Sequence, residues 1–208
     1  MKPAVDYPKG EITGVVLAGG RARRMGGQDK GLLEIDGRPM VVFVVEALKA
    51  QTTTVLINAN RNIERYRELC KCEVVPDRVG DFAGPLAGMA SAMEASKTPF
   101  ILTAPCDSPL VSGELGARLF EALQREDTEL AVAHDGERMQ PVFALLRRDL
   151  LDSMIAYLQT GESKIDTWYA MHRTALGDFS NEASMFLNVN TPEDRSQLET
   201  RFLEARES

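Results

Sequence analysis

Short apolar runs alternate along the chain with longer amphipathic stretches, and this alternation is what most constrains the fold. Strands are expected at 12–18, 54–58, 72–75, 99–104, 129–133 and 141–145. Several of these runs are continuously apolar, as expected for strands that a parallel sheet buries on both faces. Helices are expected at 39–50, 62–70, 85–96, 112–125, 147–159 and 192–205. The pattern predicts a three-layer α/β fold with a mostly parallel central sheet.

Helix start signals support two of these assignments. Ser112 precedes an apolar stripe at Leu115, Leu119 and Leu123, and a serine at that position is expected to cap a helix. The stretch Thr191-Pro192-Glu193-Asp194 combines a capping residue, a proline and two acids, which is typical of a first helical turn.

Composition narrows the class of protein. The chain has 208 residues and a net charge of −7, so a nucleic-acid binder is disfavoured. No apolar run approaches the roughly 20 residues that span a membrane. Three cysteines and two histidines favour neither a disulfide framework nor a zinc site, which fits a reducing cytoplasm. We expect a cytoplasmic protein with a flexible lead at 1–11 and a single domain over 12–208.

The most unusual stretch is LAGGRARRMGGQDKG at 17–31, directly after the first expected strand. It matches neither the Walker A motif nor G-x-G-x-x-G. One interpretation is a solvated loop with incidental charge. The other is an anion cradle, in which Gly19 and Gly20 let backbone N–H groups approach the ligand while Arg24 and Lys30 supply charge. Ligands of open α/β sheets gather beyond the carboxyl ends of strands, which favours the cradle.

The wider stretch LAGGRARRMGGQDKGLLEIDGRPM resembles the N-terminal signature of nucleotidyltransferases with a Rossmann-like fold of the glycosyltransferase-A type. Five further motifs follow in order: NANR at 58–61, PDRVGDFAGPLAGM at 76–89, PCDSPL at 105–110, QPVFAL at 140–145 and FLNVNTPED at 186–194. Together they are similar to the molybdenum cofactor guanylyltransferase family over nearly the whole chain from residue 12 to about residue 195.

The resemblance implies that GMP is transferred from GTP to the terminal phosphate of Mo-molybdopterin, with release of pyrophosphate and with Mg²⁺ as cofactor. It places Leu17, Ala18 and Gly19 on the guanosine side. The implied nucleotide-binding set continues with Gly20, Gly27, Lys30, Asn58, Asp77, Gly84, Gly88 and Asp107. The implied catalytic residues are Arg24, Lys30 and Asp107, and the implied pterin-side residues are Asn188 and Asn190.

Each of these residues also has an ordinary structural interpretation. Asp107 ends a buried strand and is implied to be the Mg²⁺ ligand, but it could cap the next helix. Asn58, Asn188 and Asn190 could close turns, although Asn190 could also lie near the metal. The Asp77 carboxylate could instead belong to a surface turn. Cys106 is expected to be a packed residue and not a nucleophile.

The later part of the chain is less informative. The pair Gln140-Pro141 is implied to lie on the second-substrate side, and the segment 161–185 is expected to shape the pterin side. Trp168 and Tyr169 could stack on a pterin, but packing in the core or in a lid is the default expectation. Both histidines are expected to be ordinary loop or surface residues.

Three alternatives remain open at this stage. A molybdopterin cytidylyltransferase or another small-molecule nucleotidyltransferase could share the fold, but cytidylyltransferases typically carry LAAG where residues 17–20 read LAGG. A non-catalytic nucleotide-binding module has little use for Asp107, and a nucleic-acid binder is disfavoured by acidity. The resemblance implies transient contact with molybdenum-insertion proteins and target molybdoenzymes, in a monomer or weak oligomer.

Overall fold

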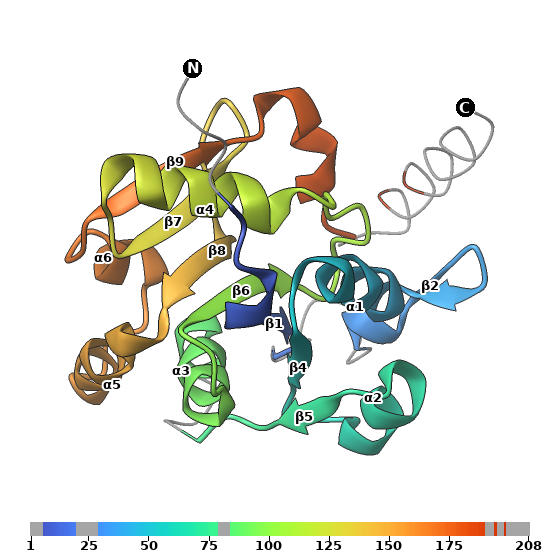
Figure 1. The fold of residues 1–208 in the computed structure, drawn as a ribbon. Helices are drawn as coiled ribbons and strands as arrows, with labels where there is room; N and C mark the ends of the chain where they lie inside the picture. The colour runs from blue at the N-terminus through green and yellow to red at the C-terminus, as the bar shows by residue number, and fades with distance from the viewer. Residues whose placement is uncertain (1–5, 20–28, 79–83, 190–193, 195–197, 199–208) are drawn as a thin grey trace.

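A seven-stranded sheet forms the centre of the computed structural model, which describes residues 6–19, 29–78, 84–189, 194 and 198. The strand order is β5-β4-β1-β6-β8-β7-β9 (Figure 1). The strands are β1 (Ile12–Leu17), β4 (Thr54–Asn58), β5 (Glu73–Val75), β6 (Phe100–Pro105), β7 (Leu130–His134), β8 (Met139–Arg147) and β9 (Thr174–Asp178). Within this sheet β8 is antiparallel to both neighbours and the other pairings are parallel, which confirms the predicted mostly parallel sheet.

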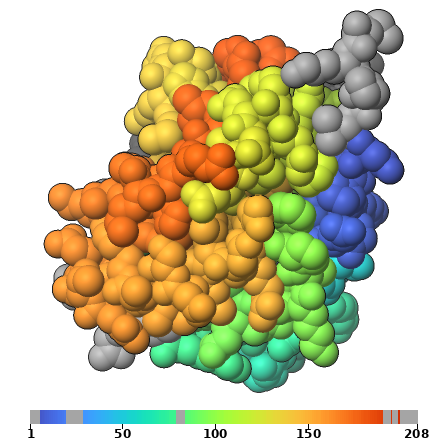
Figure 2. All heavy atoms as spheres, turned by 60° about the vertical axis from the view of Figure 1, so that its left-hand side comes forward, coloured from blue at the N-terminus to red at the C-terminus, as the bar shows by residue number. Residues whose placement is uncertain are grey.

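Helices cover both faces of the sheet. On one face lie α1 (Met40–Gln51), α2 (Ile63–Cys70) and α4 (Leu115–Glu126). On the other lie α3 (Pro85–Ala95), α5 (Leu151–Gln159) and α6 (Ile165–Tyr169). Figure 2 shows this second layer from outside, where the orange atoms of α5 and α6 lie beside the green atoms of α3. The predicted three-layer α/β class is therefore confirmed.

Short elements connect these layers. A small ladder of β2 (Glu34–Ile35) and β3 (Arg38–Pro39) lies outside the main sheet. Short 3₁₀ helices are η1 (Lys9–Glu11), η2 (Lys30–Leu32), η3 (Arg148–Leu150) and η4 (Ser180–Phe186).

The core has two large clusters that share the central strands, and a small third one formed by Ile35, Met40, Val189 and Leu198. From β1, Ile12 and Val16 pack on the side of α1 and α4, whereas Val15 and Leu17 pack on the side of α3. Because successive side chains of a strand point to opposite faces, a strand between two helical layers must be apolar throughout. Each fully buried aliphatic side chain contributes roughly 1.5–3 kcal/mol. This explains why β1 is buried at every position and carries a single polar side chain, that of Thr13.

One local expectation needs correction, and another cannot be compared in full. The helix predicted to begin at Ser112 begins at Leu115, with Glu114 at the capping position, and the Ser112 hydroxyl accepts the Glu114 N–H at 3.2 Å without capping the helix. The helix expected at 192–205 lies outside the described residues apart from Asp194 and Leu198, both of which are helical.

Only residues 6–11 of the flexible lead expected at 1–11 are described, and the flexibility of the lead stays a prediction. Tyr7 donates a hydrogen bond to the Gln51 carbonyl at 2.8 Å, and its ring meets that of Phe120 edge to face at 6.1 Å. Burial raises the pKa of Tyr7 to about 12, so the hydroxyl remains a donor. This part of the segment is docked against α1 and α4.

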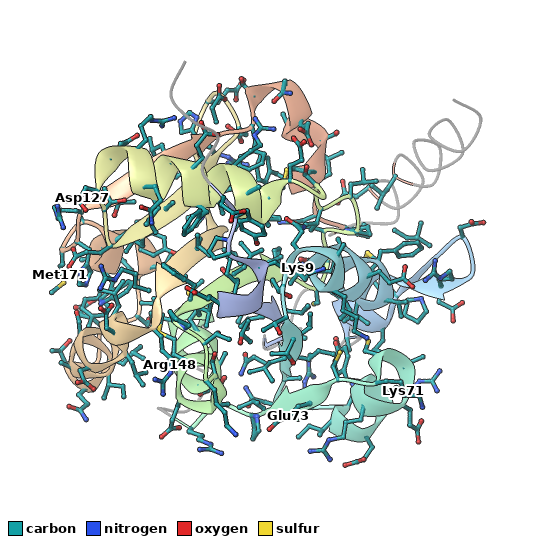
Figure 3. All side chains as sticks on the ribbon, viewed as in Figure 1. Lys9, Lys71, Glu73, Asp127, Arg148 and Met171 are labelled. Atoms are coloured by element: carbon teal, nitrogen blue, oxygen red, sulfur yellow. The ribbon has the colours of Figure 1, made fainter. Side chains whose placement is uncertain are left out.

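Charged side chains lie on opposite sides of the molecule. Figure 3 shows Lys71 and Glu73 beside β5, and Asp127 and Met171 on the opposite side of the molecule. Exposed large apolar side chains among the described residues are scattered: Met171, Leu176 and Leu187. The described helices are all too short or too polar to cross a lipid bilayer.

Candidate active site

Four neighbouring parallel strands end level with one another, and the predicted site residues lie at that edge. Leu17, the last residue of β1, pairs with Asn58 of β4 on one side and Pro105 of β6 on the other. Asn58 in turn pairs with Val75, the last residue of β5. Residues that directly follow these strand ends therefore line one edge of the sheet, in the place where open α/β sheets bind ligands.

At the β4–β5 end of this edge, Asn58 and Asp77 are joined directly. The buried Asn58 amide donates to Asp77 Oδ1 at 2.8 Å and to the Val75 carbonyl at 3.1 Å. Asn60 donates to Asp77 Oδ2 at 2.7 Å and accepts the Asp77 N–H at 2.8 Å. The Asp77 carboxylate is thus fixed by two amides and keeps further lone pairs for a ligand.

The start of α3 packs under this pair through glycine. A Cβ on Gly88 would lie 2.2 Å from Asn58 Oδ1, a distance that real side chains do not show, and 3.0 Å from a Leu17 methyl group. A Cβ on Gly19 would lie 3.2 Å from the same Asn58 oxygen. Gly84 precedes the helix with φ 78° and ψ −164°, a region that glycine alone adopts readily. The backbone comes close to Asn58 because Gly19 and Gly88 lack side chains.

At the β6 end of the edge, Lys30 and Asp107 meet. Lys30 Nζ donates to Asp107 Oδ2 at 3.2 Å, with the lysine side chain 29% exposed and the aspartate 13% exposed. Asp107 follows β6, whose next residue Cys106 donates its N–H to the Leu17 carbonyl at 3.1 Å. The predicted lysine and aspartate are therefore brought together across 77 residues of sequence.

Asp107 is suited to hold a divalent cation together with a ligand. No group of three or more His, Cys, Asp or Glu side chains is placed to hold a metal within the described residues. Mg²⁺ does not need such a cage, because it is usually bound by one or two carboxylates plus substrate phosphates and water. A single, partly exposed carboxylate beside a lysine fits that requirement.

The segment containing Asn188 runs alongside the loop after β6. The Ser108 hydroxyl donates to Asn188 Oδ1, and the Val189 N–H donates to the Asp107 carbonyl at 3.4 Å. Asn188 is exposed, whereas Ser108 is fully buried. The predicted pterin-side asparagine thus lies next to the predicted metal ligand.

The other half of the same sheet edge is formed by β7, β8 and β9. Gln140 donates to Asp135 Oδ2 at 2.6 Å across the turn between β7 and β8. Backbone N–H groups of Arg138 and Glu137 hydrogen-bond to Asp135 and lower its pKa to about 2. Gln140 is therefore held by a carboxylate that stays ionised.

Three other expectations can be judged from burial. Cys106 is buried, and burial followed by the Asp107 charge raises its pKa well above the ordinary value, so it is a packed thiol. Trp168 and Tyr169 are both buried, and Tyr169 donates to the Pro141 carbonyl at 2.7 Å, which confirms core packing. His172 lies in the loop between α6 and β9, as expected, and its ring packs 4.6 Å from the Trp168 ring and hydrogen-bonds to Ser153 at 3.0 Å.

Some predicted site residues lie outside the described residues. Other residues at this edge of the sheet were not predicted from the sequence. Gly20, Arg24, Gly27 and Asn190 belong to the first group. Asn60, Asp29 and Ser108 belong to the second. The available signals were weak: Asn60 stands two residues after Asn58 in NANR, and Asp29 and Ser108 adjoin Lys30 and Asp107.

The amide, carboxylate and ammonium groups at these adjacent strand ends are compatible with the site of a nucleotidyltransferase. The chain is an enzyme of this class, because residues 14–175 match the family model described as MobA-like NTP transferase domain.

Full-length relatives define the family more narrowly. The chain is 48% identical over 188 residues to the molybdenum cofactor guanylyltransferase of Shewanella sediminis (strain HAW-EB3), covering 90% of this chain and 95% of the relative. It is 50% identical over 188 residues to the guanylyltransferase of the same name from Shewanella sp. (strain MR-4), with the same coverage. The chain belongs to the molybdenum cofactor guanylyltransferase family.

A solved structure supports the fold independently. The molybdopterin-guanine dinucleotide biosynthesis protein A from Archaeoglobus fulgidus superposes with a TM-score of 0.74 at 20% identity, covering 92% of this chain and 99% of that chain. At that identity the likeness shows the shared fold alone.

Proposed function

We propose that this protein transfers GMP from GTP to the terminal phosphate of molybdopterin, forming molybdopterin guanine dinucleotide and releasing pyrophosphate. The observation that carries the proposal is the row of groups at one sheet edge. The Asn58–Asp77 pair lies beyond β4 and β5, and the Lys30–Asp107 pair lies beyond β6, with the end of β1 between them. A nucleoside and its phosphates have this same linear order.

Asp77 is assigned to the nucleoside end. Its two oxygens accept from Asn58 and Asn60, and each oxygen keeps lone-pair capacity for a further donor. Guanine offers donors on its N1 and N2 atoms, which a carboxylate can accept together. Leu17, Ala18 and Gly19 would lie against the nucleoside, and the names of the relatives favour guanylyl transfer over cytidylyl transfer.

Lys30 and Asp107 are assigned to the triphosphate. In the proposed reaction an oxygen of the pterin phosphate forms a bond to the α-phosphorus of GTP. The bond from that phosphorus to the bridging oxygen breaks, and the electron pair leaves with pyrophosphate. Such reactions depend mainly on positioning and on offsetting charge, which the Lys30 ammonium supplies directly. Asp107 would hold Mg²⁺, which when bound neutralises charge on the phosphate oxygens.

The remaining residues complete the assignment. Gly20, Gly27 and Arg24 are assigned to the phosphate loop. Asn188 and Asn190 are assigned to the pterin side, because Asn188 adjoins the loop that contains Asp107 through Ser108.

Selective stabilisation by nucleotides tests this assignment. The melting temperature is measured with GTP, CTP and ATP, each with and without Mg²⁺. A ligand at 100 times its dissociation constant adds about 2.7 kcal/mol to the free energy of unfolding. We expect a clear upward shift with GTP and little with CTP. A larger shift with CTP would contradict the guanosine assignment. Asp149→Asn is the control variant, because Asp149 pairs with Arg147 outside this edge, and it should show the same nucleotide shifts as the parent.

A further inference from the structure

Lys30 lies in a segment that cannot fix its own position. It is the first residue of η2, a single 3₁₀ turn of three residues. So short a turn has little stability of its own, since one hydrogen bond must offset the ordering of several residues. The position of the Lys30 backbone, from which the ammonium reaches Asp107, therefore depends on contacts that its sequence neighbours make.

The residue before Lys30 is tied to helix α2 at two points. Asp29 Oδ1 accepts a hydrogen bond from the Tyr66 hydroxyl at 2.5 Å, and Asp29 Oδ2 accepts one from the Asn62 amide at 3.0 Å. Asp29 also occupies the N-cap position of η2, where its carbonyl accepts the Leu32 N–H at 3.1 Å. Both carboxylate oxygens are thus used to hold the start of the turn.

The residue after Lys30 touches the same tyrosine. Gly31 is buried, and a Cβ at that position would lie 2.7 Å from Tyr66 Oη and 3.1 Å from Cys106 Sγ. Gly31 therefore fits between α2 and the residue that immediately precedes Asp107. Tyr66 contacts both sequence neighbours of Lys30, one by a hydrogen bond and the other by close packing.

The Asn62 side chain also serves Asp29 and not its own helix. It occupies the position before α2, where an asparagine normally caps the helix, yet it makes no side-chain cap hydrogen bond. Its backbone has a φ of 51°, and its amide is directed to Asp29. Tyr66 is fully buried, and burial keeps the pKa of its hydroxyl above the ordinary value, so it stays a donor.

We propose that Tyr66, Asp29 and Asn62 form a clamp of positioning residues that holds Lys30 opposite Asp107. The clamp rests on the proposed function, in which Lys30 offsets charge at the phosphates. It acts through Lys30 and does not touch the substrates. Because a displacement of about 1 Å can cost up to about 10²-fold in rate, loss of one anchor is measurable in turnover.

The central test is Tyr66→Phe, which removes one hydroxyl. Tyr7→Phe is the matched control, because the Tyr7 hydroxyl also makes a single hydrogen bond, to the Gln51 carbonyl at 2.8 Å. We expect Tyr66→Phe to lower kcat roughly 10- to 100-fold with a smaller change in KM for GTP, and Tyr7→Phe to leave both nearly unchanged. Equal effects of the two variants would overturn the clamp.

A double-mutant cycle separates positioning from a general structural role. In a Lys30→Ala background the clamp has nothing to position, so adding Tyr66→Phe should cost no further rate. If Tyr66→Phe lowers the rate by the same factor with and without Lys30, the clamp is overturned. Asn62→Gly is a second variant, in case Tyr66→Phe does not fold. It removes the Asn62 side chain with its amide, and glycine tolerates the positive φ of this position.

The chemical reactivity of Lys30 tests the clamp without any measurement of turnover. A negative result for the clamp can therefore be told apart from a negative result for the proposed function. The rate at which an amine-specific reagent modifies Lys30 is measured by mass spectrometry in the absence of substrates. We expect modification to be faster in Tyr66→Phe and Asn62→Gly than in the parent and in Tyr7→Phe. Unchanged reactivity of Lys30 in both clamp variants would overturn the clamp even if the enzyme transfers guanylyl groups normally.

Discussion

At the scale of single residues, Gly88 shows how a missing side chain shapes the site. Its Cα lies against the buried Asn58 amide, whose two hydrogen bonds orient Asp77 and the end of β5. The position of Asn58 thus depends on the close approach of α3. Gly88 supports the proposed nucleoside contact through Asn58, in addition to any contact of its own with the ligand.

Gly88→Ala is expected to damage both stability and nucleotide binding. The added methyl group would lie 2.2 Å from Asn58 Oδ1, so either α3 or the Asn58 side chain must move. Overpacking of this kind costs about 1–3 kcal/mol in the free energy of unfolding. Denaturant titration and KM for GTP measure the two effects. Gly113→Ala is the control, because no atom lies within 4 Å of a Cβ at that position.

At the scale of elements, the turn between β7 and β8 is organised by Asp135. Its carboxylate accepts the Arg138 and Glu137 N–H groups and the Gln140 amide. The register of the two strands shifts between Val132 and Ala133, so that Gln140 pairs with Ala133. The bulge accommodates Pro141, which has no N–H to donate to a ladder. Gln140 is thereby fixed at the sheet edge that also contains Asp107.

The pKa of Asp135 is expected to be close to 2 in the folded protein, against an ordinary value of 3.8. A lowered pKa means that the ionised carboxylate favours the folded state. This contribution is fully present above about pH 4 and is lost as the pH falls through about 2. A carboxyl-carbon NMR titration measures the value directly. Titration of Asp135 near 3.8 would contradict the hydrogen-bond arrangement of this turn.

Elements with a continuous apolar signal could be predicted from the sequence. The strand expected at 54–58 coincides with β4, and the edge formed by Asn58, Asp77 and Asp107 follows from strand ends alone. Strand β9 was missed because its large apolar residue faces solvent and its glycine faces the core, the reverse of the usual strand pattern. Leu176 is 42% exposed, while Gly177 faces inward where a Cβ would lie 2.8 Å from Leu119 of α4. Helix α6 was missed because five residues are too few to establish a period.

The partners of the site residues could not be predicted in the same way. Tyr66 and Asp29 are 37 residues apart, and Ser108 and Asn188 are 80 residues apart. Such pairings depend on how α2 and the segment after η4 pack on the sheet. Local propensity contains no information about that packing, whereas the rule that ligands bind at strand ends needs only the order of the elements.

At the scale of the whole molecule, the two large core clusters are coupled through shared strands. Val16 belongs to the cluster under α1 and α4, and Val15 to the cluster under α3 and α5. Loss of either helical layer would therefore expose one face of β1. We propose that residues 12–189 unfold as a single cooperative unit.

Trp168 provides a probe for this proposal. It is the single tryptophan of the chain and is fully buried in the cluster under α3 and α5. We expect the urea transition followed by Trp168 fluorescence to coincide with that followed by far-UV circular dichroism. Transitions separated in urea concentration would mean that the layer of α5 and α6 unfolds on its own.

Transfer of labelled nucleotide tests the central claim most directly. The protein is incubated with Mg²⁺, molybdopterin and either GTP or CTP labelled at the α-phosphate. The labelled pterin product is measured, together with the unlabelled pyrophosphate that is released. We predict transfer from GTP in strong preference to CTP, with Asp107→Asn about 10²- to 10³-fold slower although it remains folded. Preferential transfer from CTP, no transfer from GTP, or near-normal turnover by Asp107→Asn would contradict the account.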